Sequence, residues 1–244
     1  MPSPARRRLL GYYGLVGGLL LAGAALGLGI SRLGGPWSTF AFDPTVYAGL
    51  CVALFAYGWW APDVPLARRT YLALGLLTVW LALETPLDGV GDHYLQSVHM
   101  IQHMLLIAFA PPLLLLGLTP QLARFLRDLP GIAWLTEPVP ALLIYAAAIV
   151  AWHIPPLFDL TITSEPVHIL EHLAFLAAGL LFWWPAIEAT GETCQQRLAP
   201  GWKILYLFLG TFPMMAVALP LQFSRTVFYV GYASAPRLIP RSHL

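Results

Sequence analysis

The chain has 244 residues, of which 58% are hydrophobic and only 10% are charged, and its mean hydropathy is +0.70. Soluble domains are usually about 45–50% apolar and about 25% charged, so this composition excludes a cytosolic enzyme and indicates a chain that mostly faces lipid. The formal net charge of +1 provides no basic patch for nucleic acid, and two cysteines, Cys51 and Cys194, cannot form a disulfide framework or a four-cysteine metal site.

Seven apolar segments are long enough to be membrane-spanning helices, which need about 20 mostly apolar residues. In chain order they cover residues 9–30, 45–61, 70–87, 97–118, 138–153, 166–186 and 203–222. Short connections rich in proline, glycine or polar residues separate them. We therefore predict an all-α, polytopic membrane helix bundle with seven transmembrane helices. It forms a single integral membrane domain over residues 1–244, with a short disordered tail at 233–244.

The first apolar segment follows Arg6-Arg7-Arg8 and resembles a secretory signal sequence. Its apolar length of 22 residues exceeds the roughly 7–15 residues of a signal core, which favours a retained helix. Cleavage would leave the remaining topology unchanged.

Positive charges predict the orientation, because short cytoplasmic loops carry most of the lysine and arginine. Nine of the thirteen lie at the amino terminus or in alternate connections, at Arg6, Arg7, Arg8, Arg68, Arg69, Arg124, Arg127, Arg197 and Lys203. The opposite connections contain Arg32 alone, and Arg225, Arg237 and Arg241 follow the last segment. This distribution places the amino terminus in the cytoplasm and the carboxyl terminus outside.

With this topology, the histidines fall in the outer half of the membrane or outside it. His99 and His103 are four residues apart in one segment, and His168 and His172 are four apart in another. Residues at this spacing share one helical face, so each pair can supply two neighbouring ligands to one metal ion. Ionisable groups within spans normally face the bundle interior or a wet cavity.

Two methionines, Met214 and Met215, lie at about the same depth as His103 and His172, by the rise of about 1.5 Å per helical residue. Imidazole together with thioether suits copper, particularly Cu(I), better than magnesium or calcium. We therefore predict a copper site with ligands from His99, His103, His168, His172, Met214 and Met215.

A second set of residues is predicted to orient these ligands or to take up the ion. It consists of His93, His153, Glu84, Asp88, Asp159, Glu171, Met100 and Met104. Glu171 or Asp159 would hold the second ring nitrogen of a ligand histidine. Glu84 and Asp88, four apart on the third helix, are either uptake carboxylates or solvated groups at the helix end.

Prolines predict the ends and bends of three helices. Pro111-Pro112 should kink the fourth segment, and Pro155-Pro156 should end the fifth directly after His153. Ser164-Glu165-Pro166 predicts the start of a helix, whose positive dipole end favours a neutral His168 that can bind a metal.

Other interpretations of the same residues stay open. The histidines could hydrogen-bond carboxylates and water and so fasten the outer helix ends. Two of them could instead be axial ligands of a membrane haem or part of a quinol site. A copper transporter would need ligands across the inner half as well, where the sequence offers none. Taken alone, Met214 and Met215 are typical of core packing.

Four motifs in this order resemble the multi-span CtaG-type cytochrome c oxidase assembly proteins of bacteria. They are HMIQHM at 99–104, APPLLLLG at 110–117, WHIPPLFD at 152–159 and SEPVHILEH at 164–172, and the resemblance covers about residues 40–232. It implies a non-enzymatic, accessory role at the bacterial plasma (inner) membrane in maturing a haem–copper oxidase, with subunits of that oxidase as partners. An extracytoplasmic copper donor is a further expected partner. A single-span copper chaperone shares the name, but this chain lacks its cysteine ligands.

Overall fold

The computed structural model describes residues 4–34, 43–60, 64–187, 198–233 and 235, and within these ranges every regular element is helical. Arg197, Arg237, Arg241, Cys194 and nearly all of the predicted tail lie outside the described residues. The elements are α1 (Pro4–Ser31), α2 (Pro44–Trp60), α3 (Leu66–Leu83), α4 (Pro86–His93), α5 (Gln96–Met104), η2 (Leu105–Phe109), α6 (Ala110–Gly117), α7 (Pro120–Arg127), α8 (Ile132–Leu135), α9 (Pro138–Trp152), α10 (Pro155–Thr163), α11 (Glu165–Ile187), α12 (Pro200–Leu209), α13 (Thr211–Phe223) and η4 (Val230–Tyr232).

Four helices are long and apolar enough to cross a membrane. They cover Leu66–His93, Gln96–Gly117, Glu165–Ile187 and Pro200–Phe223. The pair α9 and α10, bent by 72°, is a fifth if it counts as one span. Two shorter apolar helices, Val16–Ser31 and Pro44–Gly58, are also present. The structure therefore supports four or five spans, while the count of seven and the orientation of the termini stay predictions.

The distribution of side chains is that of a membrane protein. Large apolar side chains lie on the outside, and Leu21, Phe55 and Ile204 are 65%, 65% and 72% exposed. The buried polar side chains include Glu84, His99, Gln102, His103, His168, Glu171 and His172. Soluble proteins show the opposite pattern, with charged groups almost never fully buried. A bilayer accounts for both halves of this arrangement.

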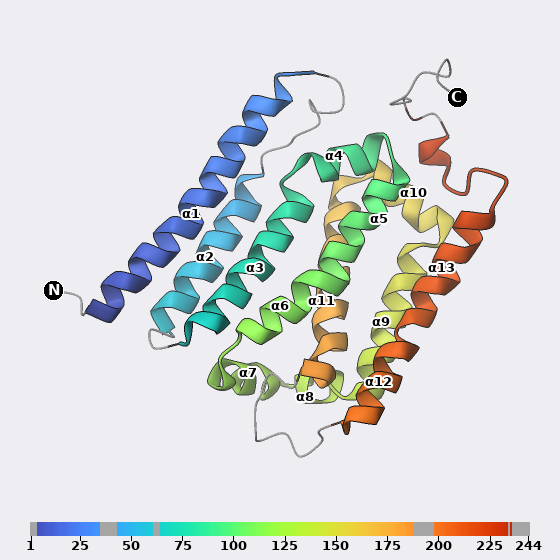
Figure 1. The fold of residues 1–244 in the computed structure, drawn as a ribbon. Coiled ribbons are helices and arrows are strands. Elements are labelled where there is room, and N and C mark those ends of the chain that lie inside the picture. Colours follow the sequence, from blue (N-terminus) through green and yellow to red (C-terminus); the bar gives the residue numbers. More distant parts are fainter. Residues whose placement is uncertain (1–3, 35–42, 61–63, 188–197, 234, 236–244) are drawn as a thin grey trace.

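The helices α1, α2 and α3 form a row that continues into α5–η2–α6 (Figure 1). α11 lies behind α5–η2–α6, and α9 and α12–α13 lie at the side of the bundle opposite α1. Glycines let α3 and α6 approach each other closely. A Cβ on Gly75 would lie 2.9 Å from the Leu114 nitrogen, and one on Gly117 would lie 2.7 Å from the Leu72 nitrogen. Small residues of this kind allow backbone-to-backbone packing between membrane helices.

The two ends of the bundle carry different chemistry. α4, α10 and η4 lie at one end, and α7, α8 and the first turns of α3 and α12 lie at the other (Figure 1). Basic residues gather at the second end, at Arg68 and Arg69 of α3, Arg124 and Arg127 of α7, and Lys203 of α12. Most of the positive charges in the described residues therefore share one end, as the loop pattern predicts, whereas Arg32 after α1 and Arg225 after α13 lie at the other. The assignment of the basic end to the cytoplasm stays a prediction.

One predicted helix is interrupted. α3 ends at Leu83, and α4 begins at Pro86 behind Thr85, whose hydroxyl accepts a hydrogen bond from the Leu87 amide at 3.3 Å. The interruption has a local cause, because proline lacks the amide that a continuous helix needs and is favoured in the first turn of a new one. Glu84 therefore ends α3 and Asp88 lies in the first turn of α4, within the single candidate span Leu66–His93.

The proline-dependent breaks appear where the sequence predicts them. Before Pro111 the chain forms the π-helical turn η2, in which the Ala110 amide bonds to the Leu105 carbonyl five residues back. This wider turn accommodates the proline rings, which donate no hydrogen bond. α9 ends at Trp152, α10 starts at Pro155, and α11 starts at Glu165.

Candidate metal centre

Four histidines from α5 and α11 meet in one buried cluster, which we call the histidine cluster: His99, His103, His168 and His172. Their exposed fractions are 0%, 4%, 4% and 7%. Ring centroids lie 4.3 Å apart within the α5 pair and 4.1 Å apart within the α11 pair. Between the helices, His99 lies 5.6 Å from His168, and His103 lies 5.8 Å from His172. The spacing along each helix thus brings both pairs to one interhelical face.

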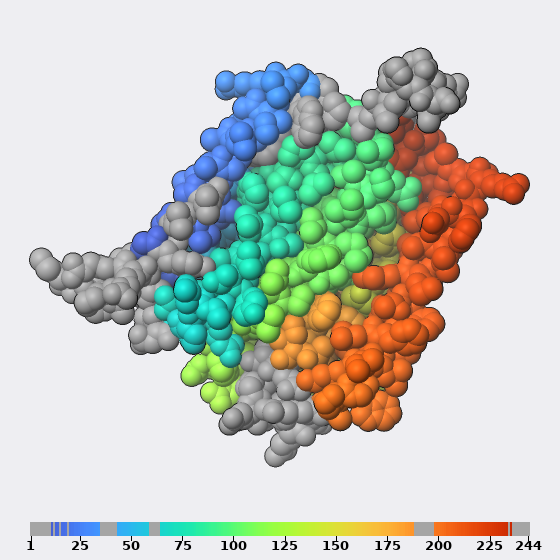
Figure 2. Space-filling model, viewed as in Figure 1, coloured from blue at the N-terminus to red at the C-terminus, as the bar shows by residue number. Residues whose placement is uncertain are grey.

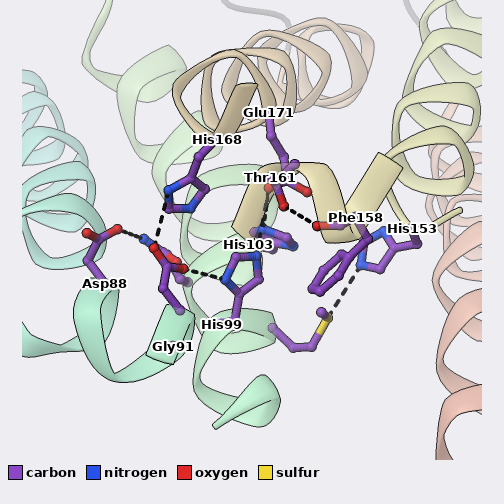
Figure 3. Close-up of polar contacts among 12 residues, drawn as sticks. Asp88, Gly91, His99, His103, His153, Phe158, Thr161, His168 and Glu171 are labelled. Carbon is purple, nitrogen blue, oxygen red and sulfur yellow. Dashed lines mark hydrogen bonds and ion pairs between the residues drawn. The ribbon is translucent and has the colours of Figure 1, made fainter. Parts of the chain in front are cut away.

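Glu171 of α11 points into this cluster (Figure 3). Its Oε2 lies 3.8 Å from His99 Nε2 and 3.6 Å from His103 Nε2. These separations exceed the usual 2.7–3.2 Å of a hydrogen bond, but ligand atoms about 2.1 Å from a tetrahedral ion stand about 3.4 Å apart. The spacing therefore fits two imidazoles and a carboxylate as ligands of one ion.

Many polar atoms of the cluster are buried without a hydrogen-bond partner among the described residues. They are His99 Nε2, both ring nitrogens of His103, His168 Nε2, His172 Nε2 and both carboxylate oxygens of Glu171. Each buried polar atom left unpaired costs about 1–3 kcal/mol, so native proteins rarely collect several in one place. A bound cation would satisfy several of the carboxylate oxygens and unprotonated ring nitrogens at once.

Asp92 of α4 holds two of the rings in place. Its Oδ1 accepts a hydrogen bond from His99 Nδ1 at 2.9 Å, and its Oδ2 lies 3.3 Å from His168 Nδ1. This is the orienting role predicted for Glu171 or Asp159. Asp159 instead accepts a hydrogen bond from the Gly231 amide at 3.2 Å, which ties α10 to η4. Sequence reasoning missed Asp92 because it lies on a different helix, and only the chain reversal between α4 and α5 returns it to the cluster.

The two other predicted carboxylates, Asp88 and Glu84, lie in different surroundings. Asp88 joins the cluster, since it accepts a hydrogen bond from the buried Gln102 amide and offers a ligand atom within 4.8 Å of those of His168 and His172. Glu84 is fully buried, but its Oε2 accepts a hydrogen bond from the Asp43 amide at 3.2 Å, on the side of α2. His93 is exposed and contacts the Gly89 carbonyl of its own helix through Nδ1 at 3.0 Å.

His153, which lies beside the cluster (Figure 3), forms with Met100 a second, softer pair of potential metal ligands. His153 Nδ1 lies 2.7 Å from the Ile149 carbonyl oxygen and must donate to it, which leaves Nε2 unprotonated. That Nε2 lies 3.4 Å from Met100 Sδ, and the ring lies 5.6 Å from that of His103. An imidazole nitrogen and a thioether are therefore close enough to share one soft ion.

A cavity of about 500 Å³ adjoins this pair, between α5, α9, α11 and α13. Its lining includes His103, His153, Met100, Met104 and Met214. Figure 2 shows the surfaces of α5 (green) and α13 (orange-red), two of the helices that line the cavity, next to each other. Met214 thus lines the cavity together with His103, whereas Met215 is 49% exposed and is absent from the lining.

Two tyrosines close the end of the bundle beside the cluster. The Tyr229 hydroxyl donates to the His153 carbonyl at 3.1 Å, and its ring stacks on Phe158 with centroids 3.8 Å apart. The Tyr232 hydroxyl donates to the Gly91 carbonyl at 2.7 Å. Burial raises the pKa of Tyr229 to about 12 and also raises the pKa of Tyr232, so both hydroxyls stay protonated donors.

Comparison with known proteins places this chain in a family. It is 30% identical over 179 residues to an uncharacterized protein of Mycobacterium bovis and, equally, to one of Mycobacterium tuberculosis. Each match covers 62% of this chain but 26% of the relative, so the matched region spans about a quarter of those longer proteins. No solved structure matches the chain. The model of the cytochrome c oxidase caa3 assembly factor family matches residues 45–242, most of the chain, which therefore belongs to that family.

Proposed function

We propose that this chain assists the assembly of a haem–copper oxidase by holding copper as cargo in the histidine cluster, without catalysing a reaction itself. The observation that carries the proposal is the set of buried ring nitrogens that lack hydrogen-bond partners among the described residues and lie at ligand spacing around Glu171. The family description supports oxidase assembly. The softer pair of His153 and Met100 favours copper among the metals that imidazole binds.

The proposed setting is the bacterial plasma membrane, with oxidase subunits and an extracytoplasmic copper donor as partners. The two shorter apolar helices, added to five spans, make seven. Basic residues at the end opposite α4 and α10 support an orientation with that basic end in the cytoplasm. The cluster would then lie in the outer half of the membrane, where an extracytoplasmic donor can reach it.

The proposal is tested by replacing His103 and His172 together with alanine in the full chain, purified anaerobically in detergent. Cu(I) affinity, measured by competition with a chromophoric chelator, should fall sharply, because each helix loses one of its two histidine ligands. The matched control is His93→Ala, which removes an exposed histidine outside the cluster and should leave the affinity unchanged. Unchanged copper binding in the double variant would refute the site.

Two other functions have distinct signatures in the same preparation. A membrane haem protein would show an intense Soret band that shifts on reduction. A transporter would move copper into sealed vesicles that contain the purified chain alone. We expect neither the Soret band nor copper uptake into the vesicles. In cells whose own copy is deleted, the wild-type chain, but not the double variant, should restore the copper content of the oxidase.

A further inference from the structure

We infer that the histidine cluster holds two metal ions side by side, an inference that rests on the proposed metal-binding function. Three groups of residues each offer three ligand atoms within 4.8 Å of one another: Asp88, His168 and His172; Asp92, His99 and His168; and His99, His103 and Glu171. The first and third groups share no residue, whereas the second group shares His168 with the first and His99 with the third. Two ions can therefore be held at once, each by its own triad.

Asp92 lies between the two triads and fixes one ring of each. It engages Nδ1 of His99 with one carboxylate oxygen and Nδ1 of His168 with the other, at 2.9 and 3.3 Å. The opposite nitrogen of each ring, Nε2, is buried without a hydrogen-bond partner among the described residues. One carboxylate thus leaves a free nitrogen on each of two rings that belong to different triads.

The distances between the triads suit neighbouring ions. Ring centroids of His99 and His168 lie 5.6 Å apart, those of His103 and His172 5.8 Å, and those of His99 and His172 6.4 Å. Within each helix the pairs are closer, at 4.3 and 4.1 Å. The donors therefore separate into two groups, and two-metal sites in proteins commonly hold ions about 3.5–4 Å apart.

Charge also favours more than one cation. Asp88, Asp92 and Glu171 bring three carboxylates to the cluster, and the ion pairs of Asp92 and Glu171 in the described part of the chain are with histidines. Buried charges are costly unless they are paired. With all three carboxyl groups ionised and the imidazoles neutral, one monovalent ion would leave two negative charges without compensation. A second ion reduces the uncompensated negative charge of the cluster or removes it.

The test counts metal ions in the full chain with Cu(I) alone and, separately, with Zn(II) alone. After anaerobic gel filtration, elemental analysis should give two ions per wild-type chain. The variant His103→Ala with Glu171→Gln should keep one, and Asp88→Asn with His172→Ala should keep one. X-ray absorption of the wild-type protein with two copper ions should show copper–copper scattering, a readout that requires no variant to fold.

The outcomes separate this inference from the proposed function. One ion per wild-type chain, with no metal–metal scattering, would overturn the two-ion inference and leave the proposed function intact. No bound ion would overturn the proposed function. Loss of both ions in either paired variant, when its circular dichroism and elution match the wild type, would overturn the division into two triads.

Discussion

The sharpest test of the site is Glu171→Gln, which removes one negative charge and almost no volume. Glu171 is fully buried, and its Oε2 lies 3.6 Å and 3.8 Å from two imidazole nitrogens. Because neither carboxylate oxygen accepts a hydrogen bond within the described residues, the substitution breaks none there. We therefore expect the variant to insert and fold like the wild type while its metal affinity falls.

The size of the loss follows from the geometry. Ligand atoms that lie within 4.8 Å of one another place a central ion within about 3 Å of the carboxylate oxygen. At that distance, a unit charge and a carboxylate attract by about 5 kcal/mol with an effective dielectric constant near 20. The amide oxygen that replaces the carboxylate still offers a weak dipole, so a net loss of about 3–4 kcal/mol remains, or roughly a factor of 10² to 10³ in affinity.

The assay is chelator competition with Cu(I) in detergent, with thermal unfolding as a check on the fold. Glu165→Gln is the matched control, because it removes the same charge from the same helix at an exposed position and should change the affinity less than threefold. An affinity for Glu171→Gln within threefold of the wild type would show that the carboxylate is not a ligand, and the spacing argument would fail.

Three further outcomes follow from the same contacts. Copper affinity should fall as the pH is lowered, because protonated imidazole cannot bind metal, and an affinity that stays flat down to the pH at which the protein unfolds would contradict histidine ligation. Gly179→Ala should lower the free energy of unfolding by about 1–3 kcal/mol, since its Cβ would lie 2.6 Å from the Ile107 carbonyl oxygen, whereas Gly201→Ala, with nothing within 4 Å, should not lower it. Tyr229→Phe should cost about 1 kcal/mol in thermal unfolding, because it loses the hydrogen bond to His153 but keeps its stacking, and a loss as large as that of Tyr229→Ala would refute this division.

Local patterns predicted most of the helices and the shared helical face of each histidine pair. The segment expected at 138–153 is α9 at Pro138–Trp152, and the proline breaks fall at the expected residues. A helix of about 20 apolar residues and a proline that cannot donate a hydrogen bond are both local properties, so one sequence suffices to find them. The meeting of α5 with α11 is not local, because it depends on how the spans are ordered in the bundle.

For the methionines of α13, the sequence predicts the depth in the membrane but not the direction in which each side chain points. The depth of Met214 and Met215 follows from a fixed rise per residue, but which of them faces inward depends on the rotation of α13 about its axis. That helix is apolar on all sides, so no polar stripe indicates its inner face. The structure turns Met214 toward the cavity and leaves Met215 49% exposed. Lipid-facing and bundle-facing positions of such a segment look alike in a single sequence.

Under the proposed function, the cavity offers an ion held in the histidine cluster a direction in which to leave. His103 belongs both to the buried triad with Glu171 and to the cavity lining, and its ring lies 5.6 Å from that of His153. An ion that gives up carboxylate and imidazole on one side of His103 meets the nitrogen and sulfur of His153 and Met100 on the other. A bare ion in the bilayer would be very costly, so a transfer in which each lost ligand is replaced by the next proceeds more easily than direct release. Under the proposed function, the softer ligand atoms on the cavity side favour Cu(I) over Zn(II) as the ion that takes this route.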